Sequence, residues 1–392
     1  MNAAEPDEVI IVGASLVGLC AAWQLRKLGV ERITVLEKRR FGHRKGAGHG
    51  RSRAVSCAGF DEPLLGLLLL AREQGWPELQ AALGKQVFTA ASGLVVGPLT
   101  DAFTKRATAF FGMPDLVKPI PLAKARSDWP SLTLEAGTGT ATDASAMLIA
   151  AEVATDALMV WLQNNGVQLV PNTEVTSLHS TADGLWLETN RGRFMSERVI
   201  CTAGFGTKTL FERSESRVKS RKVVSAFFEV DAPEAMWRVG KFPVVRGLGE
   251  DGQPEWTVAP EFADRGIKVT RHSREGGLED DYGLGAMRAW FQDMLGVRIT
   301  QQLGREVRRV VHIGDRPLIA DTHHDDPRIV FAAGFNGQEV AVAPTLGKAL
   351  AELVLDGRSG IAAFQRNRKY FALPRRGLPT RRKRTSAQGV KF

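Results

Sequence analysis

A glycine-rich turn between two apolar segments is the feature that most constrains this chain. Residues 8–39 read "EVIIVGASLVGLCAAWQLRKLGVERITVLEKR". Residues 9–12 form a short apolar run suited to a buried strand, residues 16–28 have helical spacing, and residues 33–36 form a second apolar run. Gly29 ends the helix. This order predicts a βαβ unit and therefore a Rossmann-like domain.

The turn itself has the spacing of a dinucleotide-binding site. It reads Gly13-Ala14-Ser15-Leu16-Val17-Gly18, with Ser15 in place of the usual middle glycine. Gly13 allows the tight turn, the small residue at 15 lets a pyrophosphate approach the backbone, and Gly18 lets helix and strand pack closely. The phosphates then lie at the helix N-terminus, where free N–H groups and the helix dipole favour anions. We therefore assign Gly13, Ser15, Leu16 and Gly18 to cofactor binding.

An acidic residue ends the second strand. Glu37 is placed to accept hydrogen bonds from an adenosine ribose, and we include its neighbour Lys38 in the site. An acid at this place disfavours the 2′-phosphate of NADP, which leaves FAD or NAD.

Two later segments favour FAD. "VICTAGFGT" (199–207) repeats an apolar strand followed by a turn of small residues. "VFAAGFNGQEVAVAPTLGKAL" (330–350) places a glycine-rich turn before a helix whose N-terminus could stabilise negative charge on a reduced flavin. Taken alone, either segment is equally well an ordinary strand-to-helix turn. We assign to FAD binding Val175, Gly204, Gly334, Asn336, Gly337 and Gln338.

The rest of the chain predicts a second domain. Residues 144–164 have helical spacing, and the following stretch to 204 alternates apolar and polar residues between turns, as short strands do. Residues 93–97, 223–231 and 266–272 also resemble strands and predict an antiparallel sheet. Residues 328–334 predict a buried strand and 345–357 a helix closed by Gly357.

The expected fold is therefore α/β plus α+β, a Rossmann-like FAD-binding domain with a substrate domain built on an antiparallel sheet. We expect the FAD-binding domain to comprise residues 1–86, 142–216 and 316–365. The substrate and catalytic domain is expected at 87–141 and 217–315, with a flexible basic tail at 366–392.

Composition and charge limit the cellular location and the kinds of ligand that we expect for this chain. No run of about 18 apolar residues occurs and the N-terminus lacks the pattern of a signal peptide, so we expect a cytoplasmic protein without a membrane segment. Cys20, Cys57 and Cys201 lack metal-ligand spacing and are expected to be reduced and structural, with no metal site. Ten of the positive charges behind the net +9 lie in residues 365–392, which favours a solvated tail over a nucleic-acid-binding surface.

From about residue 8 to residue 357, the chain resembles the glycine oxidase and sarcosine oxidase group of FAD-dependent amine oxidases, most closely the monomeric sarcosine oxidase branch. The segments that carry the resemblance are "GASLVGL", "HGRSR", "GLVVGP", "GIKVTRH" and "FAAGFNGQEVAVAPTLGKALAEL". It implies that the loop at 46–56 lies against the flavin.

The resemblance also implies roles for five residues. His49 and Arg53 take the positions of a flavin-contacting histidine and arginine, and Ser52 replaces a threonine. Lys268 matches a lysine near flavin N5 associated with oxygen activation, and His272 matches an active-site histidine. A cation fixed there would stabilise the negative charge that develops as electrons pass to O2.

Two departures from the family pattern affect substrate and cofactor. The resemblance implies a carboxylate-binding arginine and lysine at the positions of Ser56 and Ala341, near Gln338, so each charge-assisted contact of about 1.5–3 kcal/mol is absent. Sarcosine is therefore not the expected substrate. Residues 305–321 also lack the cysteine that often links FAD in this branch, which predicts non-covalent FAD, with His312 as an alternative covalent ligand.

The expected function is FAD-dependent oxidation of a C–N bond in an amine or amino-acid-derived substrate of specialised metabolism. Hydride passes from the neutral amine to flavin N5, giving an imine, and O2 reoxidation gives H2O2. The alternatives are a dehydrogenase with another acceptor, a monooxygenase, and a flavin-fold binding protein without turnover. The monooxygenase is disfavoured because the proline of Gly314-Asp315-Arg316-Pro317 comes too early. The sequence leaves the oligomeric state open, with a monomer favoured.

Overall fold

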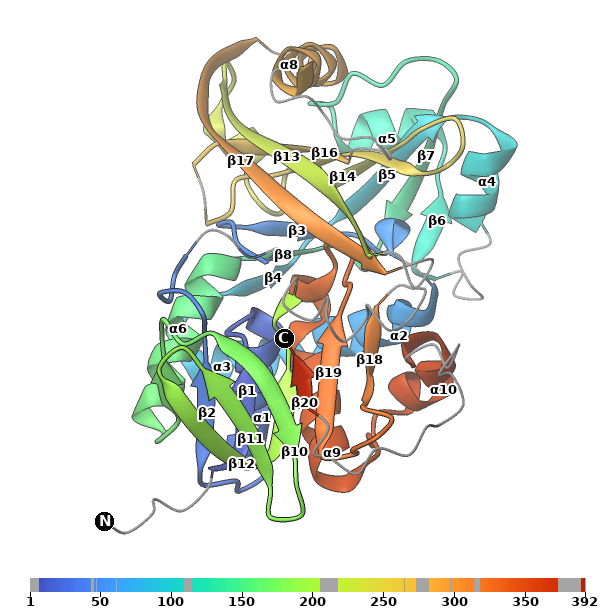
Figure 1. Cartoon of the computed structure of the whole chain (residues 1–392). Helices are drawn as coiled ribbons and strands as arrows, with labels where there is room; N and C mark the ends of the chain where they lie inside the picture. Colours follow the sequence, from blue (N-terminus) through green and yellow to red (C-terminus); the bar gives the residue numbers. More distant parts are fainter. Residues whose placement is uncertain are drawn as a thin grey trace.

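A computed structural model describes residues 7–43, 46, 48–60, 62–108, 115–204, 218–263, 265–272, 282–296, 298–313, 318–372 and 389–391. Two large sheets lie at opposite ends of the molecule, and a small sheet lies between them (Figure 1). The chain crosses between the two ends several times, so each end is assembled from segments that are distant in sequence.

The first large sheet contains the predicted βαβ unit. Strand β1 (Asp7–Val12) is hydrogen-bonded in parallel to β2 (Ile33–Leu36) and to the second half of β12 (Gly192–Cys201). The sheet continues through β9 (Gln168–Val170) beside β2, through β19 (Ile329–Ala333) beside β12, and through β18 (Ile319–Thr322) beside β19. The first half of β12 joins an antiparallel extension with β11 (Leu185–Thr189), β10 (Val175–Ser180) and β20 (Gly389–Lys391). The parallel core places the carboxyl ends of β1, β2 and β12 at one edge.

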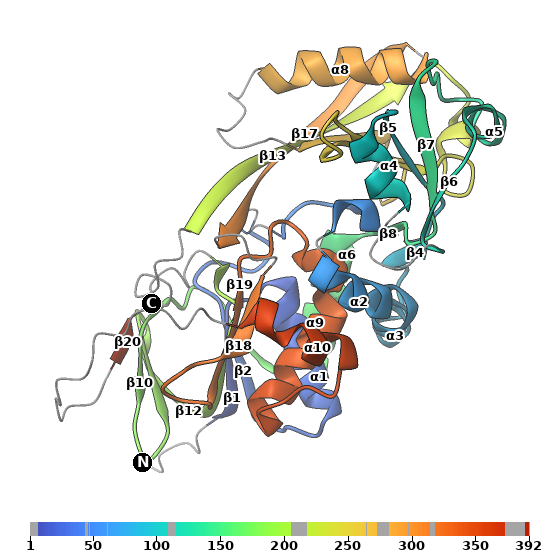
Figure 2. The same ribbon diagram turned by 90° about the vertical axis from the view of Figure 1, so that its right-hand side faces the viewer.

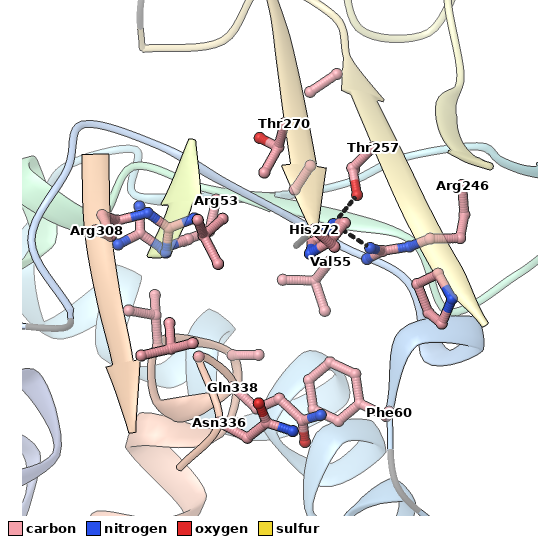
Figure 3. A pocket seen from close by; sticks show the side chains of 18 of the residues that line it. Arg53, Val55, Phe60, Arg246, Thr257, Thr270, His272, Arg308, Asn336 and Gln338 are labelled. Carbon is pink, nitrogen blue, oxygen red and sulfur yellow. Dashed lines mark hydrogen bonds between the residues drawn. The ribbon is translucent and has the colours of Figure 1, made fainter. Parts of the chain in front are cut away.

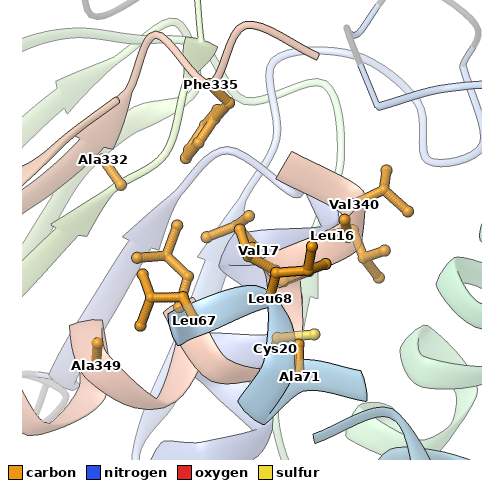
Figure 4. Packing of buried hydrophobic residues seen from close by; sticks show 14 of the residues in the cluster. Leu16, Val17, Cys20, Leu67, Leu68, Ala71, Ala332, Phe335, Val340 and Ala349 are labelled. Atoms are coloured by element: carbon orange, nitrogen blue, oxygen red, sulfur yellow. The ribbon is translucent and has the colours of Figure 1, made fainter. Parts of the chain in front are cut away.

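Two helices cover this sheet and pack closely. Helices α1 (Leu16–Lys27) and α9 (Glu339–Asp356) cross where a Cβ on Gly347 would lie 2.7 Å from the Cβ of Cys20 (Figure 4). Cys20, Cys57 and Cys201 are all buried, and burial raises the pKa of the Cys201 thiol to about 12. Burial raises the pKa of the Cys20 thiol as well, so Cys20 and Cys201 contribute to packing in their neutral form.

Further helices surround the same end of the molecule. They are α2 (Glu62–Leu70), α3 (Trp76–Leu83), α6 (Ala151–Asn164) and α10 (Ala362–Phe371), with one π-helical turn, η2 (Ala71–Gly75), between α2 and α3. None of the helices in these described ranges combines the length and the apolar character needed to cross a membrane.

The second large sheet forms the other end. Its strand order is β17 (Ile299–Ile313), β13 (Val218–Val230), β16 (Ile267–His272), β15 (Pro254–Ala259), β14 (Val244–Leu248), β5 (Gly93–Pro98), β7 (Thr138–Asp143) and β6 (Val117–Pro119). Neighbouring strands are antiparallel, as predicted, except that β14 and β5 are parallel. Helix α8 (Tyr282–Leu295) covers the face turned away from the first sheet (Figure 2), and α4 (Asp101–Thr108) and α5 (Leu122–Asp128) flank the β5–β6 side.

The small middle sheet corrects one sequence-based prediction. Strand β8 (Met147–Ile149) pairs with β3 (Arg53–Val55) and β4 (Phe88–Ala90), so part of the helix predicted over 144–164 is a strand and α6 begins at Ala151. Helical spacing could not exclude a strand held by partners far away in sequence. Helix α9 also begins earlier than predicted, at Glu339, and contains Pro344 in its second turn.

Candidate functional site

The glycine turn between β1 and α1 forms a close-packed cradle. Gly13 has φ +100°, and a Cβ there would lie 2.9 Å from the Cα of Ala203. A Cβ on Gly18 would lie 2.5 Å from both the Gly13 carbonyl oxygen and Thr202 Oγ1. Thr202 Oγ1 donates to the Gly13 carbonyl at 2.8 Å, which locks the end of β12 against the turn. Only glycine fits at positions 13 and 18 without displacing this backbone.

The helix start and the acid beside it complete the cradle. Ser15 caps α1, because its Oγ accepts a hydrogen bond from the Gly18 N–H at 3.1 Å. Glu37 lies at the end of β2, where its carboxylate accepts from the Ala14 N–H and the Arg39 N–H, each at 3.0 Å. His43 Nε2 lies 3.2 Å from the same carboxylate. An oriented acid therefore borders a helix N-terminus, and this donor and acceptor set fits the diphosphate and ribose of FAD.

The other residues assigned to the nucleotide lie at different depths. Leu16 and Val175 are buried in the apolar core on either side of the sheet, whereas the Lys38 side chain is exposed. Gly204 follows β12 with φ +59°, and residues 205–207 of the predicted turn lie outside the described residues.

A cavity of about 500 Å³ separates the second large sheet from the start of α9. Figure 3 shows Thr257, Thr270, His272 and Arg246 on the sheet side, with Asn336, Gln338 and Phe60 opposite. Ser52, Arg53 and Lys268 also line it. Loop 46–56, strand β16 and the turn before α9 were assigned to one site from sequence, and all three contribute to this cavity.

Three strands present an ordered face to the cavity. Val223 pairs with His272 on one side and Arg308 on the other, and two residues further along Ser225 pairs with Thr270 and Glu306. Phe227 pairs with Lys268 and Gly304. Because alternate residues of a strand share a face, Lys268, Thr270 and His272 point to the same side of β16.

Lys268 is buried at one end of this face, opposite Phe227 of β13. Its Nζ donates to the Ser52 carbonyl oxygen and to Glu306 Oε2, each at 2.9 Å, and it lies 4.9 Å from the centre of the Phe227 ring. Burial, reinforced by the nearby Arg53 and Arg308 cations, lowers the pKa of Lys268 to about 8, although Glu306 opposes this shift. A lysine here can therefore change charge within the physiological range of pH.

Glu306 connects that lysine to the loop. Its Oε1 accepts from the Arg51 N–H at 3.0 Å while Oε2 accepts from Lys268. Burial alone would raise the pKa of Glu306, but Lys268 and the Arg51 N–H hold it below its ordinary value. The pair is therefore ionised at neutral pH.

Arg53 is enclosed by its own loop. Its guanidinium donates to the carbonyl oxygens of Ser52 at 2.8 Å and Gly48 at 3.0 Å, and also to that of His49. Arg53 is 6% exposed, so a fixed positive charge borders the cavity beside Lys268.

His272 occupies the opposite end of the face from Lys268. Its Nε2 lies 2.8 Å from both Arg246 Nη1 and Thr257 Oγ1. Because arginine is only a donor, this contact holds Nε2 as an acceptor, which favours the neutral imidazole. Arg246 on β14 is itself 6% exposed, so the cluster presents a buried positive charge to the cavity.

The two positions assigned to substrate differ in their surroundings. Ala341 lines the cavity in the first turn of α9, with Gly337 and Gln338 beside it. Ser56 is buried outside the lining, and its Oγ donates to Asp143 Oδ2 at 2.6 Å.

Gly334 has φ +75° in the turn after β19, and Asn336 donates its N–H to the Val311 carbonyl oxygen at 2.9 Å. The backbone of His312 lies in β17 opposite Lys219, and its side chain is outside the description.

The sequence interpretation missed the residues that come from strands without a motif. Arg246, Thr257, Glu306 and Arg308 belong to this group. Thr270 could have been found, because it lies between Lys268 and His272 in a period of two on the same strand.

Comparison with known proteins gives concordant results. The family model "FAD dependent oxidoreductase" matches residues 8–353. The monomeric sarcosine oxidase of Bacillus sp. (strain B-0618) is 24% identical over 92% of this chain and 96% of its own, and the N-methyl-L-tryptophan oxidase of Yersinia pestis (strain Pestoides F) is 23% identical over 90% and 96%. Among solved structures, NikD, an unusual amino acid oxidase essential for nikkomycin biosynthesis, has a TM-score of 0.75 at 19% identity, covering 91% of this chain and 96% of that one. The resemblance seen in sequence is confirmed.

Proposed function

Because this chain belongs to the FAD-dependent oxidoreductase family, we propose that it oxidises the C–N bond of an amine or amino-acid-derived substrate and passes the electrons to O2. FAD, when bound, supplies the two-electron chemistry, accepting hydride from the substrate carbon to give an imine and yielding H2O2 on reoxidation. The glycine cradle, the Ser15 cap and Glu37 hold the nucleotide end of the cofactor.

The single observation that carries this proposal is Lys268, a buried cation in the cavity wall beside Arg53. Negative charge that develops as electrons reach O2 is stabilised by a cation already fixed in place, because no reorganisation is needed at that moment. The loop carbonyl oxygens orient Arg53, and the Ser52 carbonyl with Glu306 orients Lys268. These residues therefore act by position and charge.

The substrate must enter as a neutral amine, because only the unprotonated nitrogen has a lone pair to support hydride loss. The cavity favours that form, since burial and the positive charges of Lys268, Arg53 and Arg246 all disfavour a further cation. We propose that His272, held as an acceptor on Nε2, supports the same preference.

We further propose that sarcosine is not the substrate. Ser56 and Ala341 provide no cation where the resemblance implies a carboxylate clamp. The cavity of about 500 Å³ accommodates a larger amine. An oxidase of N-methyl-L-tryptophan is among the chain's sequence relatives, and an unusual amino acid oxidase of nikkomycin biosynthesis is among the structures that it resembles. An amine intermediate of specialised metabolism fits both observations.

The function is tested by mixing the oxidised protein with a panel of amines under anaerobic conditions. A substrate should bleach the flavin absorbance band, and admission of O2 should restore it with release of one peroxide per substrate. Bleaching without rapid recovery would favour a dehydrogenase, and a requirement for NADPH would favour a monooxygenase. A protein that binds FAD but responds to no amine would favour a binding protein.

We propose that FAD is bound non-covalently and that the protein acts as a cytoplasmic monomer. Of the tail predicted at 366–392, residues 366–371 belong to helix α10 and residues 389–391 form strand β20. Acid precipitation tests the attachment, because non-covalent FAD passes into the supernatant whereas a covalent link leaves a coloured pellet. We also retain the proposed division into an FAD-binding domain and a substrate domain, which limited proteolysis of the FAD-loaded protein would test.

A further inference from the structure

A buried ion pair spans three strands of the second sheet. Lys268 on β16 and Glu306 on β17 are separated by β13, and their side chains meet at 2.9 Å above it. The side chains of Lys268 and Glu306 are 6% and 15% exposed. Isolated buried charges are costly, so each of these charges depends on the other.

The carboxylate also ties the pair to the loop at 46–56. Glu306 Oε1 accepts from the Arg51 N–H, while Lys268 donates to the carbonyl oxygen of the next residue, Ser52. A Cβ on Gly50 would lie 2.9 Å from Glu306 Oε2, so the loop approaches the carboxylate more closely than any other residue type would allow. Glu306 therefore contacts both the lysine and the loop.

The other charges near Lys268 make this carboxylate important. Arg308 on β17 and Arg53 on β3 both oppose a charged lysine, and β13 contributes the Phe227 ring. Glu306 is the anion that hydrogen-bonds to Lys268 among the described residues. Without it, the lysine would share a buried site with two arginines and would lose its proton more readily.

From these contacts we propose that Glu306 is a positioning residue that keeps the Lys268 ammonium charged and aimed at the flavin site. The inference rests on the proposed function and deepens it. Glu306 acts through Lys268 and has no assigned contact with substrate.

The test substitutes Glu306→Gln, because glutamine keeps an oxygen for the Arg51 N–H while removing the charge. The absorbance spectrum of the oxidised, FAD-loaded protein is recorded from pH 6 to 10, with Lys268→Met as the reference that lacks the titrating group. The wild type should show a transition near pH 8 that is absent in Lys268→Met. In Glu306→Gln the transition should move to lower pH by about one unit or more.

Two further variants and a second readout complete the test. Glu229→Gln removes the carboxylate of an exposed ion pair with Arg265 in the same sheet and should leave the transition unchanged. Glu306→Asp keeps a carboxylate at this position and should return the transition toward the wild-type pH. This variant provides the test if Glu306→Gln does not fold. The rate of reoxidation by O2, measured across the same range, should fall at a lower pH in Glu306→Gln.

The outcomes separate the two proposals. A Glu306→Gln transition at the wild-type pH, or an unchanged pH at which reoxidation falls, would overturn the role of Glu306 while leaving that of Lys268 intact. If Lys268→Met neither removes the transition nor slows reoxidation, the proposed role of Lys268 is wrong, and the role of Glu306, which depends on it, is wrong as well.

Discussion

The nucleotide cradle and the amine cavity are built in opposite ways. The cradle comes from one continuous segment, to which the turn after β12 adds Thr202 and Ala203. The cavity is lined by residues from β3, β13, β14, β15, β16 and β17, from the turn before α9 and from the start of α9. The cradle binds through backbone geometry, whereas the cavity depends on side-chain charge. This difference explains why the cofactor could be inferred from a short motif and the substrate could not.

Because the cradle depends on backbone fit, the largest effect of a substitution is expected on FAD affinity at Gly18. Gly18→Ala places a Cβ 2.5 Å from backbone and side-chain oxygens, so the turn must open and the phosphate site with it. We expect FAD affinity to fall about 100-fold or more, which corresponds to a strain of about 3 kcal/mol. The matched control is Gly285→Ala in α8, where a Cβ meets nothing within 4 Å. Equal flavin content in the two purified variants would show that the cradle does not depend on backbone fit.

A smaller effect, on the KM for sarcosine, is expected from adding a cation at Ala341. Ala341→Lys would add a positive charge to the cavity wall at the position where the resemblance implies a carboxylate-binding lysine. A single charge-assisted contact of about 1.5 kcal/mol should lower the KM for sarcosine about tenfold. Ala341→Met, of similar length without charge, should not. If both variants behave alike, cavity volume rather than charge excludes sarcosine.

The smallest predicted effects concern stability and pH, and they have different origins in the two regions. Near the first sheet, burial opposes ionisation of Asp326, but hydrogen bonds from Arg328 and Ser180 hold its pKa at about 2. Its stabilising contribution is therefore present above its ordinary pKa of 3.8 and is lost as pH falls toward 2. Asp326→Asn should cost about 1–2 kcal/mol at neutral pH, and the difference from wild type should shrink below pH 4. Denaturant titrations at several pH values would measure this, and a constant difference would contradict it.

In the cavity, the positive charge of Lys268 destabilises the folded protein, whereas the negative charge of Asp326 stabilises it. Its pKa of about 8 lies below the ordinary 10.5, so the unfolded chain binds more protons between these values and stability rises with pH there. Lys268→Met should remove that rise. The same titrations, carried out on the protein without FAD, would reveal it, and an unchanged slope would mean that Lys268 is not buried as a cation.

The sequence predicted the elements whose pattern is local. The strand at residues 33–36 has the predicted bounds because it is a run of neighbouring apolar residues. Helix α1 ends within one residue of the expected position because Gly29 follows it. Strand β17 was missed for a physical reason: Arg308 lines the cavity and Glu306 lies on the same face of the strand, so this face carries charged residues and the usual alternation is absent.

The site was predicted only in part for a related reason. Lys268, His272 and Arg53 were assigned through the resemblance, and all three line the cavity. Their partners Glu306, Arg246 and Thr257 are brought to them by strand register, which no single segment encodes. Ser56 shows the converse, since its hydrogen bond to Asp143 holds it outside the cavity lining.

The most direct test of the central claim needs no knowledge of the substrate. The FAD-loaded wild type and Lys268→Met are reduced with light under anaerobic conditions and mixed with O2 in a stopped-flow instrument, with Lys241→Met, which removes an exposed lysine, as the control. A buried cation in the cavity predicts that reoxidation slows about 100-fold or more in Lys268→Met and is unchanged in Lys241→Met. Equal rates in all three proteins would contradict the assignment of oxygen chemistry to this cavity.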